Sequence, residues 1–257
     1  MDDREKLLAD MDPVRRFSDR AADYRRHRPD YPAAALDAVL AGLGDPRALV
    51  VADVGAGTGI ASRLLAARGV IVTAIEPNPE MRAAAEPAAG VSWRDGVAEA
   101  TGLASSSVQL VLCAQSFHWF RPRQALEEFH RILVPAGRLA LLWNSRDRED
   151  ELTRGYTEAI HEVNGEHPAE LRPFDPEVIT ESGRFSAPVI ERFPHQQELD
   201  RQGLLGRATS ASYVPREGPA FARLASLLER LWERHRDARG RVRIRYQTMV
   251  VRAERLG

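Results

Sequence analysis

The sequence predicts an α/β protein built on a doubly wound, mostly parallel β-sheet. Short apolar runs typical of buried strands alternate with helical segments, and a glycine-rich turn follows the first of these runs. Because crossovers between parallel strands are right-handed, this alternation predicts an open sheet with helices on both faces. A chain of 257 residues is long enough to bury such a sheet in one domain.

The strands and helices of this core follow one another over residues 33–146. Strands are expected at residues 48–54, 70–75, 91–94, 107–113 and 137–143. Helices are expected at residues 33–43, 60–68, 79–89 and 123–133. Five strands that alternate with helices indicate βαβ units and therefore a parallel sheet.

The chain differs on either side of this core. Residues 1–32 are polar and rich in arginine, with apolar residues at roughly helical spacing, which predicts an N-terminal helical cap. Residues 147–257 are expected to hold lid helices and the last two strands of the same sheet. The helices are placed at 147–180 and 199–240, and the strands at 189–195 and 242–253. The last run alternates charged and apolar residues, as an edge or antiparallel strand does.

Composition excludes several classes of protein. The net charge of −1 does not suit a general polyanion binder, and a single cysteine, Cys113, rules out an internal disulfide framework. No run approaches the roughly 20 apolar residues of a membrane span, and the acidic start at residues 1–5 is unlike a secretory signal. We expect a cytoplasmic protein. No metal site is expected, because no His, Asp and Glu set has ligand spacing.

The glycine-rich turn, residues 53–59, is the segment that points to chemistry. Its glycines let the backbone turn sharply and approach a ligand, and the helix that follows offers unpaired N–H groups. In an open α/β sheet, ligands bind beyond the carboxyl ends of the strands. The third and sixth positions from Gly55 are Gly57 and Ile60, so the dinucleotide fingerprint is incomplete. A phosphate-binding Gly-Lys-Ser/Thr is absent from this turn.

Two acidic residues at strand ends indicate which ligand would fit. Glu76 ends the second strand, where its carboxylate can accept two hydrogen bonds from ribose hydroxyls. Asp53, beside the turn, suits the ammonium group of an amino-acid cofactor. Together these features predict S-adenosylmethionine; a nicotinamide cofactor or a purely structural turn is the alternative. The alternative for Asp53 is a cap on the following helix.

At this point the sequence resembles the class I S-adenosylmethionine-dependent methyltransferases, specifically small-molecule enzymes of the trans-aconitate and ubiquinone/menaquinone type. Residues 51–59 match the first motif of that family, residues 75–77 the second, and residues 96–99 the adenine loop. Residues 116–120 resemble a His-Trp segment after the fourth strand, and residues 19–32 resemble the N-terminal cap. The resemblance implies a Rossmann-like sheet of seven strands, the last antiparallel, with helical lid insertions.

The resemblance also implies a cofactor site for S-adenosylmethionine, with S-adenosylhomocysteine as the product. The residues expected to bind the cofactor are Tyr24, Asp53, Gly55, Ala56, Gly57, Glu76, Pro77, Met81, Val97, Ala98 and Gln115. Core packing is the alternative for Tyr24, and an ordinary helix start is the alternative for Gln115. Val97 and Gln109 depart from the family pattern, in which polar and Asp residues are frequent.

His118 is the candidate catalytic residue, because it follows the fourth strand near the expected position of the reacting methyl group. A histidine there can take a proton from an acceptor O–H or N–H; packing beside Trp119 is the alternative. Methyl transfer also proceeds by positioning alone, so a base is optional. Trp119, Trp143 and Asn144 are expected to wall the substrate pocket, with core packing as the alternative.

Three functions remain open from the sequence. The first is methyl transfer to an O, N or C atom of a small metabolite by a monomer or homodimer, with no nucleic-acid or membrane partner. The second, a nucleic-acid methyltransferase, is disfavoured because residues 114–117 lack the Asn/Asp-Pro-Pro-aromatic motif. The third is a protein that binds the cofactor without methylating, as a regulatory module or in another reaction.

Overall fold

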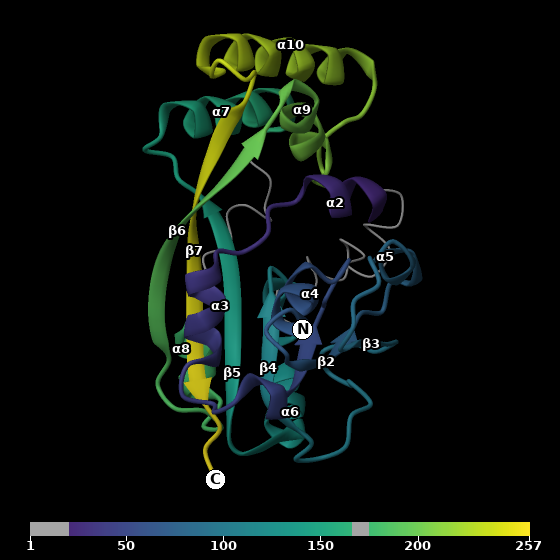
Figure 1. Ribbon diagram of the computed structural model, residues 1–257, viewed down its shortest axis with the longest axis vertical. Coiled ribbons are helices and arrows are strands. Elements are labelled where there is room, and N and C mark those ends of the chain that lie inside the picture. The colour runs from purple at the N-terminus through teal and green to yellow at the C-terminus, as the bar shows by residue number, and fades with distance from the viewer. Residues whose placement is uncertain (1–20, 166–174) are drawn as a thin grey trace.

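The computed structural model describes residues 21–165 and 175–257, so predictions that fall on residues 1–20 and 166–174 lie outside the described residues. Figure 1 shows an elongated molecule. Its central sheet runs along the long axis, and a group of helices covers one end.

A single sheet of seven strands forms the centre of the molecule. The strands are β1 (Val50–Val54), β2 (Ile71–Ile75), β3 (Val91–Arg94), β4 (Val108–Ala114), β5 (Leu133–Arg146), β6 (Val189–Leu199) and β7 (Val242–Glu254). Their order across the sheet is β3-β2-β1-β4-β5-β7-β6. Strand β7 is antiparallel to both of its neighbours, and the pairs on the other side of β5 are parallel. The predicted fold class is confirmed, including the antiparallel last strand.

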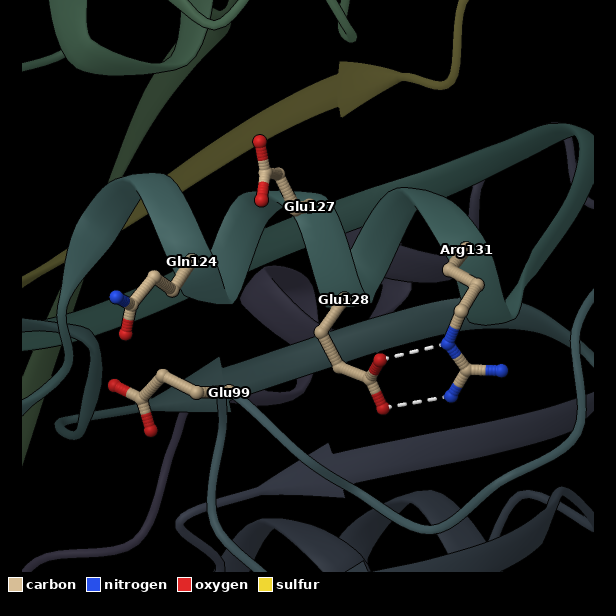
Figure 2. A pocket seen from close by; sticks show the side chains of 5 residues that line it. All are labelled: Glu99, Gln124, Glu127, Glu128 and Arg131. Atoms are coloured by element: carbon tan, nitrogen blue, oxygen red, sulfur yellow. Dashed lines mark hydrogen bonds and ion pairs between the residues drawn. The ribbon is translucent and has the colours of Figure 1, made fainter.

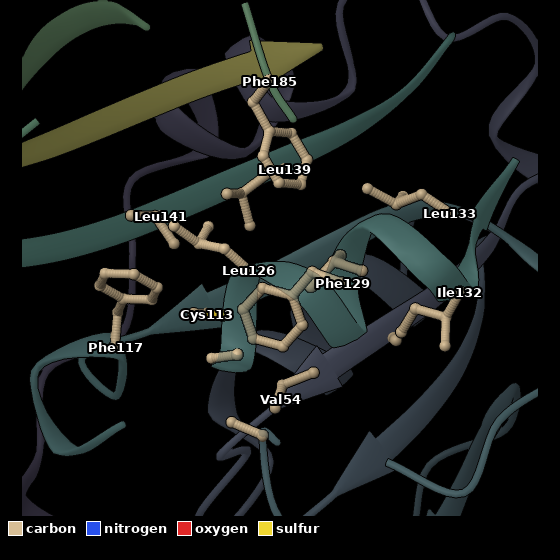
Figure 3. Packing of buried hydrophobic residues seen from close by; sticks show 14 of the residues in the cluster. Val54, Cys113, Phe117, Leu126, Phe129, Ile132, Leu133, Leu139, Leu141 and Phe185 are labelled. Carbon is tan, nitrogen blue, oxygen red and sulfur yellow. The ribbon is translucent and has the colours of Figure 1, made fainter. Parts of the chain in front are cut away.

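One face of the sheet is covered by α6 (Pro122–Ile132) and α8 (Glu177–Glu181). Pro122 stands in the first turn of α6, where its missing N–H costs nothing. The helix then buries an apolar face that includes Leu126 and Phe129. Figure 3 shows these side chains against Cys113 and Leu141 of the sheet.

The opposite face is covered by α3 (Ala33–Leu40) and α4 (Ile60–Ala66). Leu36 of α3 and Leu65 of α4 lie in one buried cluster with Leu112 and Leu142 of the strands. Leu112 packs on this side and Cys113, its neighbour, on the other, because successive strand residues face opposite sides. Helices therefore cover both faces, as a doubly wound sheet requires.

The last three strands are longer than expected and carry the helical lid. We call α7 (Glu151–Asn164), α9 (Arg201–Thr209) and α10 (Gly218–His235) the lid. Leu199, Val242, Ile244 and Tyr246 extend beyond the core strands and pack under these helices in a third apolar cluster. Figure 1 shows β5, β6 and β7 reaching up to the lid. The predicted helical stretches thus resolve into several helices.

Two boundaries differ from expectation for local reasons. Strand β1 begins at Val50 because Pro46–Ala48 forms a 3-10 turn, closed by the Asp45 side chain accepting from the Arg47 N–H. Helix α5 (Pro79–Ala83) stops well short of residue 89. Pro87 disfavours helical backbone in the residue before it, so the helix could not have continued to residue 89 without a break.

Helix α2 (Ala21–His27) lies between the lid and the carboxyl edge of the sheet (Figure 1). On the lid side, Gln197 Nε2 donates to the His27 carbonyl at 2.9 Å, and Arg216 forms an ion pair with Asp23 at 2.6 Å. Beyond the helix, Asn144 Nδ2 donates to the Asp30 carbonyl at 2.8 Å. The N-terminal segment therefore joins the lid to the sheet. The division of the chain at residues 32 and 146 stays a prediction.

Candidate active site

The glycine turn between β1 and α4 is held against two neighbouring strand ends. Gly55, Gly57 and Gly59 have φ angles of +68°, +59° and +75°, which residues with side chains rarely adopt. The N–H groups of Gly55 and Ala56 donate to the Ile75 carbonyl at 2.9 and 3.1 Å. A Cβ on Gly55 would lie 2.6 Å from the Cβ of Ser116. Only glycine fits at this position.

Glu76 braces the same turn from the end of β2. Its side chain is buried, and Oε2 accepts a hydrogen bond from the Gly57 N–H at 2.9 Å. Oε1 accepts from the Asn78 N–H at 3.0 Å. Burial raises the pKa of Glu76, although these two hydrogen bonds act against the shift. Each carboxylate oxygen has two lone pairs, so both can accept a further hydrogen bond.

Asp53 lies fully buried at the end of β1. Its Oδ2 accepts a hydrogen bond from Ser62 Oγ, in the first turn of α4, at 2.5 Å. Its Oδ1 has no partner among the described residues, which is costly for a buried carboxylate. Burial raises the pKa of Asp53 to about 6, although the Ser62 hydrogen bonds oppose the shift.

This burial makes the Asp53 carboxylate a source of pH-dependent instability. The folded protein holds the Asp53 proton up to about pH 6, whereas the unfolded chain releases it near 3.8, so the stability contribution falls as pH rises between these values. We expect Asp53→Asn to raise the free energy of unfolding at pH 7 by about 3 kcal/mol, as two pKa units imply. Urea unfolding at pH 4 to 8 checks this. A difference that does not grow between about pH 4 and 6 contradicts it.

The predicted adenine loop follows β3. Ala98 is buried, whereas Val97 is 39% exposed, and the Ala100 N–H donates to the Val97 carbonyl at 3.1 Å. Thr101 anchors the end of the loop: its N–H and hydroxyl both donate to Glu128 Oε1, at 2.9 and 2.6 Å. The loop is therefore fixed to α6 and also to its own strand, because Arg94 Nη1 of β3 donates to the Gly102 carbonyl at 3.0 Å.

Figure 2 shows the hollow outside this loop, lined by Glu99, Gln124, Glu127, Glu128 and Arg131. The Glu128 carboxylate and the Arg131 guanidinium form an ion pair at 2.7 Å, and Arg131 Nη2 also donates to the Leu103 carbonyl. These contacts satisfy Glu128 internally. We interpret the hollow as the outer support of the loop and not as a ligand site.

The chain leaves β4 through a strained turn. Gln115 has a φ angle of +58°, and its Nε2 donates to the Asn144 carbonyl at 3.2 Å. Ser116 Oγ then donates to the Val54 carbonyl at 2.7 Å, which ties the ends of β4 and β1 together. Backbone strain of this kind, which costs on the order of 1–3 kcal/mol, is concentrated at functional sites. It supports an active site at this edge of the sheet.

His118 lies directly after this turn, in the 3-10 helix Phe117–Trp119. Its ring packs on the Trp119 ring, with centroids 4.7 Å apart and planes inclined by 46°. Both therefore lie beyond the carboxyl end of β4, next to the strand end that leads into the glycine turn. The contact is compatible with a catalytic role and with the packing role, so the catalytic assignment stays a prediction.

Trp143 and Asn144 occupy the carboxyl half of β5. Trp143 is partly buried against the apolar cluster under α6, next to Met249 of β7. Asn144 uses both ends of its amide internally: Nδ2 donates to the Asp30 carbonyl, and Oδ1 accepts from Thr248 Oγ1 at 2.6 Å. As a pocket wall, Asn144 would act by positioning the N-terminal segment.

Tyr24 and Met81 flank the glycine turn from above the sheet edge. A Cβ on Gly57 would lie 3.3 Å from Met81 Cε and 3.9 Å from Tyr24 Cε1. The Arg28 guanidinium lies over the Tyr24 ring, 4.7 Å from its centroid. The structure thus brings α2, α5 and the glycine turn together. Pro77, between β2 and α5, adjoins the same cluster.

Sequence reasoning missed several residues that build this edge. Ser62, Ser116, Thr101 and Glu128 hold its loops by hydrogen bonds between residues 9 to 62 positions apart, which no local pattern reveals. In the described ranges, no group of three His, Cys, Asp or Glu residues is placed to hold a metal ion. Within the same ranges, no helix has the length and apolar character needed to cross a membrane.

Comparison with known proteins agrees with this geometry. Residues 52–141 match the family model of a methyltransferase domain. An uncharacterised methyltransferase of Mycobacterium tuberculosis is 36% identical over 207 residues, which cover 77% of this chain and 76% of the relative. The chain belongs to the S-adenosylmethionine-dependent methyltransferases. The cofactor of this methyltransferase is S-adenosylmethionine, with S-adenosylhomocysteine as the product.

Other relatives match this methyltransferase over a smaller share of their own length or at lower sequence identity. A methyltransferase-like protein of Schizosaccharomyces pombe is 36% identical over 142 residues, which is 54% of this chain but only 56% of the relative. A solved structure of a candidate type II methyltransferase from Anaeromyxobacter dehalogenans has a TM-score of 0.61 at 22% identity, covering 89% of this chain and 97% of that one. At that identity the match establishes the fold alone.

Proposed function

We propose that this methyltransferase acts on an O, N or C atom of a small metabolite. The observation that carries the proposal is the position of α2, which closes over the strand ends that hold the glycine turn and Glu76. Hydrogen bonds and an ion pair join α2 to β6 and to the chain after α9. A covered site suits a small acceptor better than a nucleic-acid strand, and a net charge of −1 agrees with this.

The residues at the strand ends fit the cofactor. Glu76 would accept from the ribose hydroxyls with its remaining lone pairs, and the unpartnered Oδ1 of Asp53 is an acceptor for a positively charged group. Gly55 and Gly57 leave the space that a Cβ would fill. Ala56, Pro77, Met81, Val97, Ala98 and Gln115 are assigned to the same cofactor site, and Tyr24 covers it.

Arg28 supplies a cation at the end of this site. It stacks on Tyr24, and its Nε is buried without a hydrogen-bond partner among the described residues. The amino-acid part of the cofactor carries a carboxylate, and guanidinium groups bind carboxylates well. We therefore add Arg28 to the proposed cofactor residues.

The cofactor would supply the reactive methyl group, and side chains of the protein would position the acceptor and remove its proton. When bound, S-adenosylmethionine supplies an electrophilic methyl group on a sulfonium. His118 would take the proton that the acceptor atom releases, while Trp119 and Trp143 hold the acceptor and exclude water. Asn144 would support this pocket wall through its hydrogen bonds to Asp30 and Thr248. The strained turn at Gln115 and Ser116 fixes where His118 stands.

Calorimetry with S-adenosylhomocysteine tests the proposed site. Wild-type protein is expected to bind one equivalent with micromolar-scale affinity, on the order of −8 kcal/mol. Glu76→Ala should weaken binding about 10–100-fold, because two hydroxyls lose an ionised acceptor and the Gly57 N–H loses its partner. Asp37→Ala, which removes an exposed carboxylate paired with Arg68, is the control and should change nothing. Unchanged affinity in Glu76→Ala removes Glu76 from the site.

The acceptor class requires a second assay, with methyl-labelled cofactor. We expect label to pass to members of a small-metabolite panel and not to RNA or DNA. Label found only on nucleic acid would contradict the proposed acceptor class. Cofactor binding without transfer to any acceptor would instead favour a protein that binds the cofactor and does not methylate.

A further inference from the structure

Two arginines lie near each other between α2 and the lid, and the part of the chain that the structure describes supplies no carboxylate partner to either. Arg28, next to the end of α2, donates through Nη2 only to the Ser210 carbonyl, at 3.4 Å. Arg207 of α9 is 6% exposed and donates through Nε to Tyr246 Oη at 3.2 Å. Among the described residues neither guanidinium has an acidic partner, and the terminal nitrogens of Arg207 make no hydrogen bond.

The fold holds these two arginines close together. Gly206, next to Arg207, packs on His27 so tightly that a Cβ there would lie 2.4 Å from the His27 ring. Gln197 donates to the carbonyl of His27 and also contacts Tyr246 Oη at 3.4 Å. The Arg207 charge acts on Arg28, and burial followed by this repulsion lowers the pKa of Arg28. The arrangement is electrostatically unfavourable for Arg28, whereas the neighbouring phenols Tyr246 and Tyr156 raise the pKa of Arg207 against the effect of burial and keep it charged.

A buried phenol completes the cluster. Tyr156 of α7 is fully buried, and its hydroxyl has no hydrogen-bond partner among the described residues. Burial raises the pKa of Tyr156 to about 12, so the hydroxyl keeps its proton and can donate to an anion. The charges of Arg207 and Arg146 act on this phenol, and Arg146 lies 5.4 Å from the ring centroid.

The cluster has more positive charge than the cofactor can balance. One carboxylate of the cofactor satisfies one guanidinium, and Arg28, stacked on Tyr24 beside the glycine turn, stands nearest to it. Arg207 lies further into the lid and remains unbalanced. A largely buried guanidinium with no carboxylate partner among the described residues attracts an oxyanion, so an occupant with an oxyanion would balance its charge.

We propose that the methyl acceptor is a small organic anion, whose carboxylate or phosphate group binds to Arg207 and the Tyr156 hydroxyl. This inference rests on the proposed function. It places the anionic end of the acceptor under the lid, with the atom to be methylated directed toward the strand ends that carry His118. It also explains why this buried arginine has phenol neighbours and, within the described ranges, no acidic partner.

Calorimetry on the protein saturated with S-adenosylhomocysteine tests the proposal. Benzoate is the carboxylate probe, benzamide is its neutral analogue, and inorganic phosphate distinguishes a phosphate subsite. We expect benzoate or phosphate to bind, and benzamide to bind at least about 10-fold more weakly. Arg207→Met should lose the preference for the anion and keep its affinity for S-adenosylhomocysteine. Arg201→Met, which removes an exposed arginine from the same helix, should keep the preference.

Tyr156→Phe keeps the test decisive if Arg207→Met fails to fold. Its hydroxyl makes no bond among the described residues, so its loss should leave the protein folded while it weakens the anion probe several-fold. The proposal is overturned if neither anion binds, if benzamide binds equally well, or if both variants bind the anion as wild type does. Failure of S-adenosylhomocysteine itself to bind the wild type would instead refute the proposed function.

Discussion

His118→Asn is expected to lower the rate of methyl transfer about 10²–10⁴-fold while affinity for S-adenosylhomocysteine stays unchanged. His118 follows the strained turn at the end of β4, where its ring packs on Trp119 and is directed by that contact. Asparagine keeps a polar side chain of similar reach but cannot take up the proton of the acceptor. The loss should therefore fall on kcat and not on cofactor binding.

The pH profile separates a base from a positioning residue. If His118 is the base, the wild-type rate should fall at low pH, because a protonated imidazole cannot take up the proton of the acceptor. His118→Asn should have lost this dependence. His130→Asn is the matched control, because His130 of α6 contacts the Leu256 carbonyl, away from the proposed site. A small loss in His118→Asn with an unchanged pH profile would leave His118 as a positioning residue.

Gly55→Ala is expected to destabilise the protein strongly and to abolish cofactor binding. The φ angle of +68° costs a residue with a side chain about 1–2 kcal/mol, and the new Cβ would lie 2.6 Å from Ser116 Cβ. Separating these atoms would disturb the Ser116 hydrogen bond to the Val54 carbonyl. Overpacking of this kind adds about 1–3 kcal/mol, so we expect a total loss of about 2–5 kcal/mol.

Gly183→Ala is the control that measures the cost of a positive φ angle alone in the free energy of unfolding. Gly183 has nearly the same φ angle, +66°, and nothing lies within 4 Å of the position that a Cβ would take there. Urea unfolding of both variants should show the larger loss for Gly55→Ala, with the difference measuring the contact with Ser116. Equal losses would mean that the turn does not press against the end of β4.

Sequence reasoning identified the sheet because its signals are local. Each strand of the core is a short apolar run, and the turn glycines mark where β1 ends. The positions of Gly55 and Glu76 at the ends of the first two strands were therefore predictable. The predicted range of the last strand, 242–253, agrees with β7 to within one residue, but the extent of β5 and β6 was not predictable. Their outer halves are strands because they pair with β7, which depends on residues far away in the chain.

The arginine cluster shows a different limit of the sequence. Lys6 is the only lysine among 36 basic residues, so no arginine stands out by its type. Arg28 and Arg207 are 179 positions apart, and only the contact of α2 with α9 brings their charges together. The supports of the cofactor edge, such as Ser62 for Asp53 and Glu128 for Thr101, are equally invisible without the fold.

A crystal structure of the protein with S-adenosylhomocysteine tests the central claim, that the cofactor binds at the edge formed by the glycine turn and Glu76. We expect the ribose hydroxyls on the Glu76 carboxylate and the amino-acid end beside Gly55 and Gly57, beneath Tyr24. An adenosyl group bound elsewhere, with Glu76 still contacting only the N–H groups of Gly57 and Asn78, would contradict it.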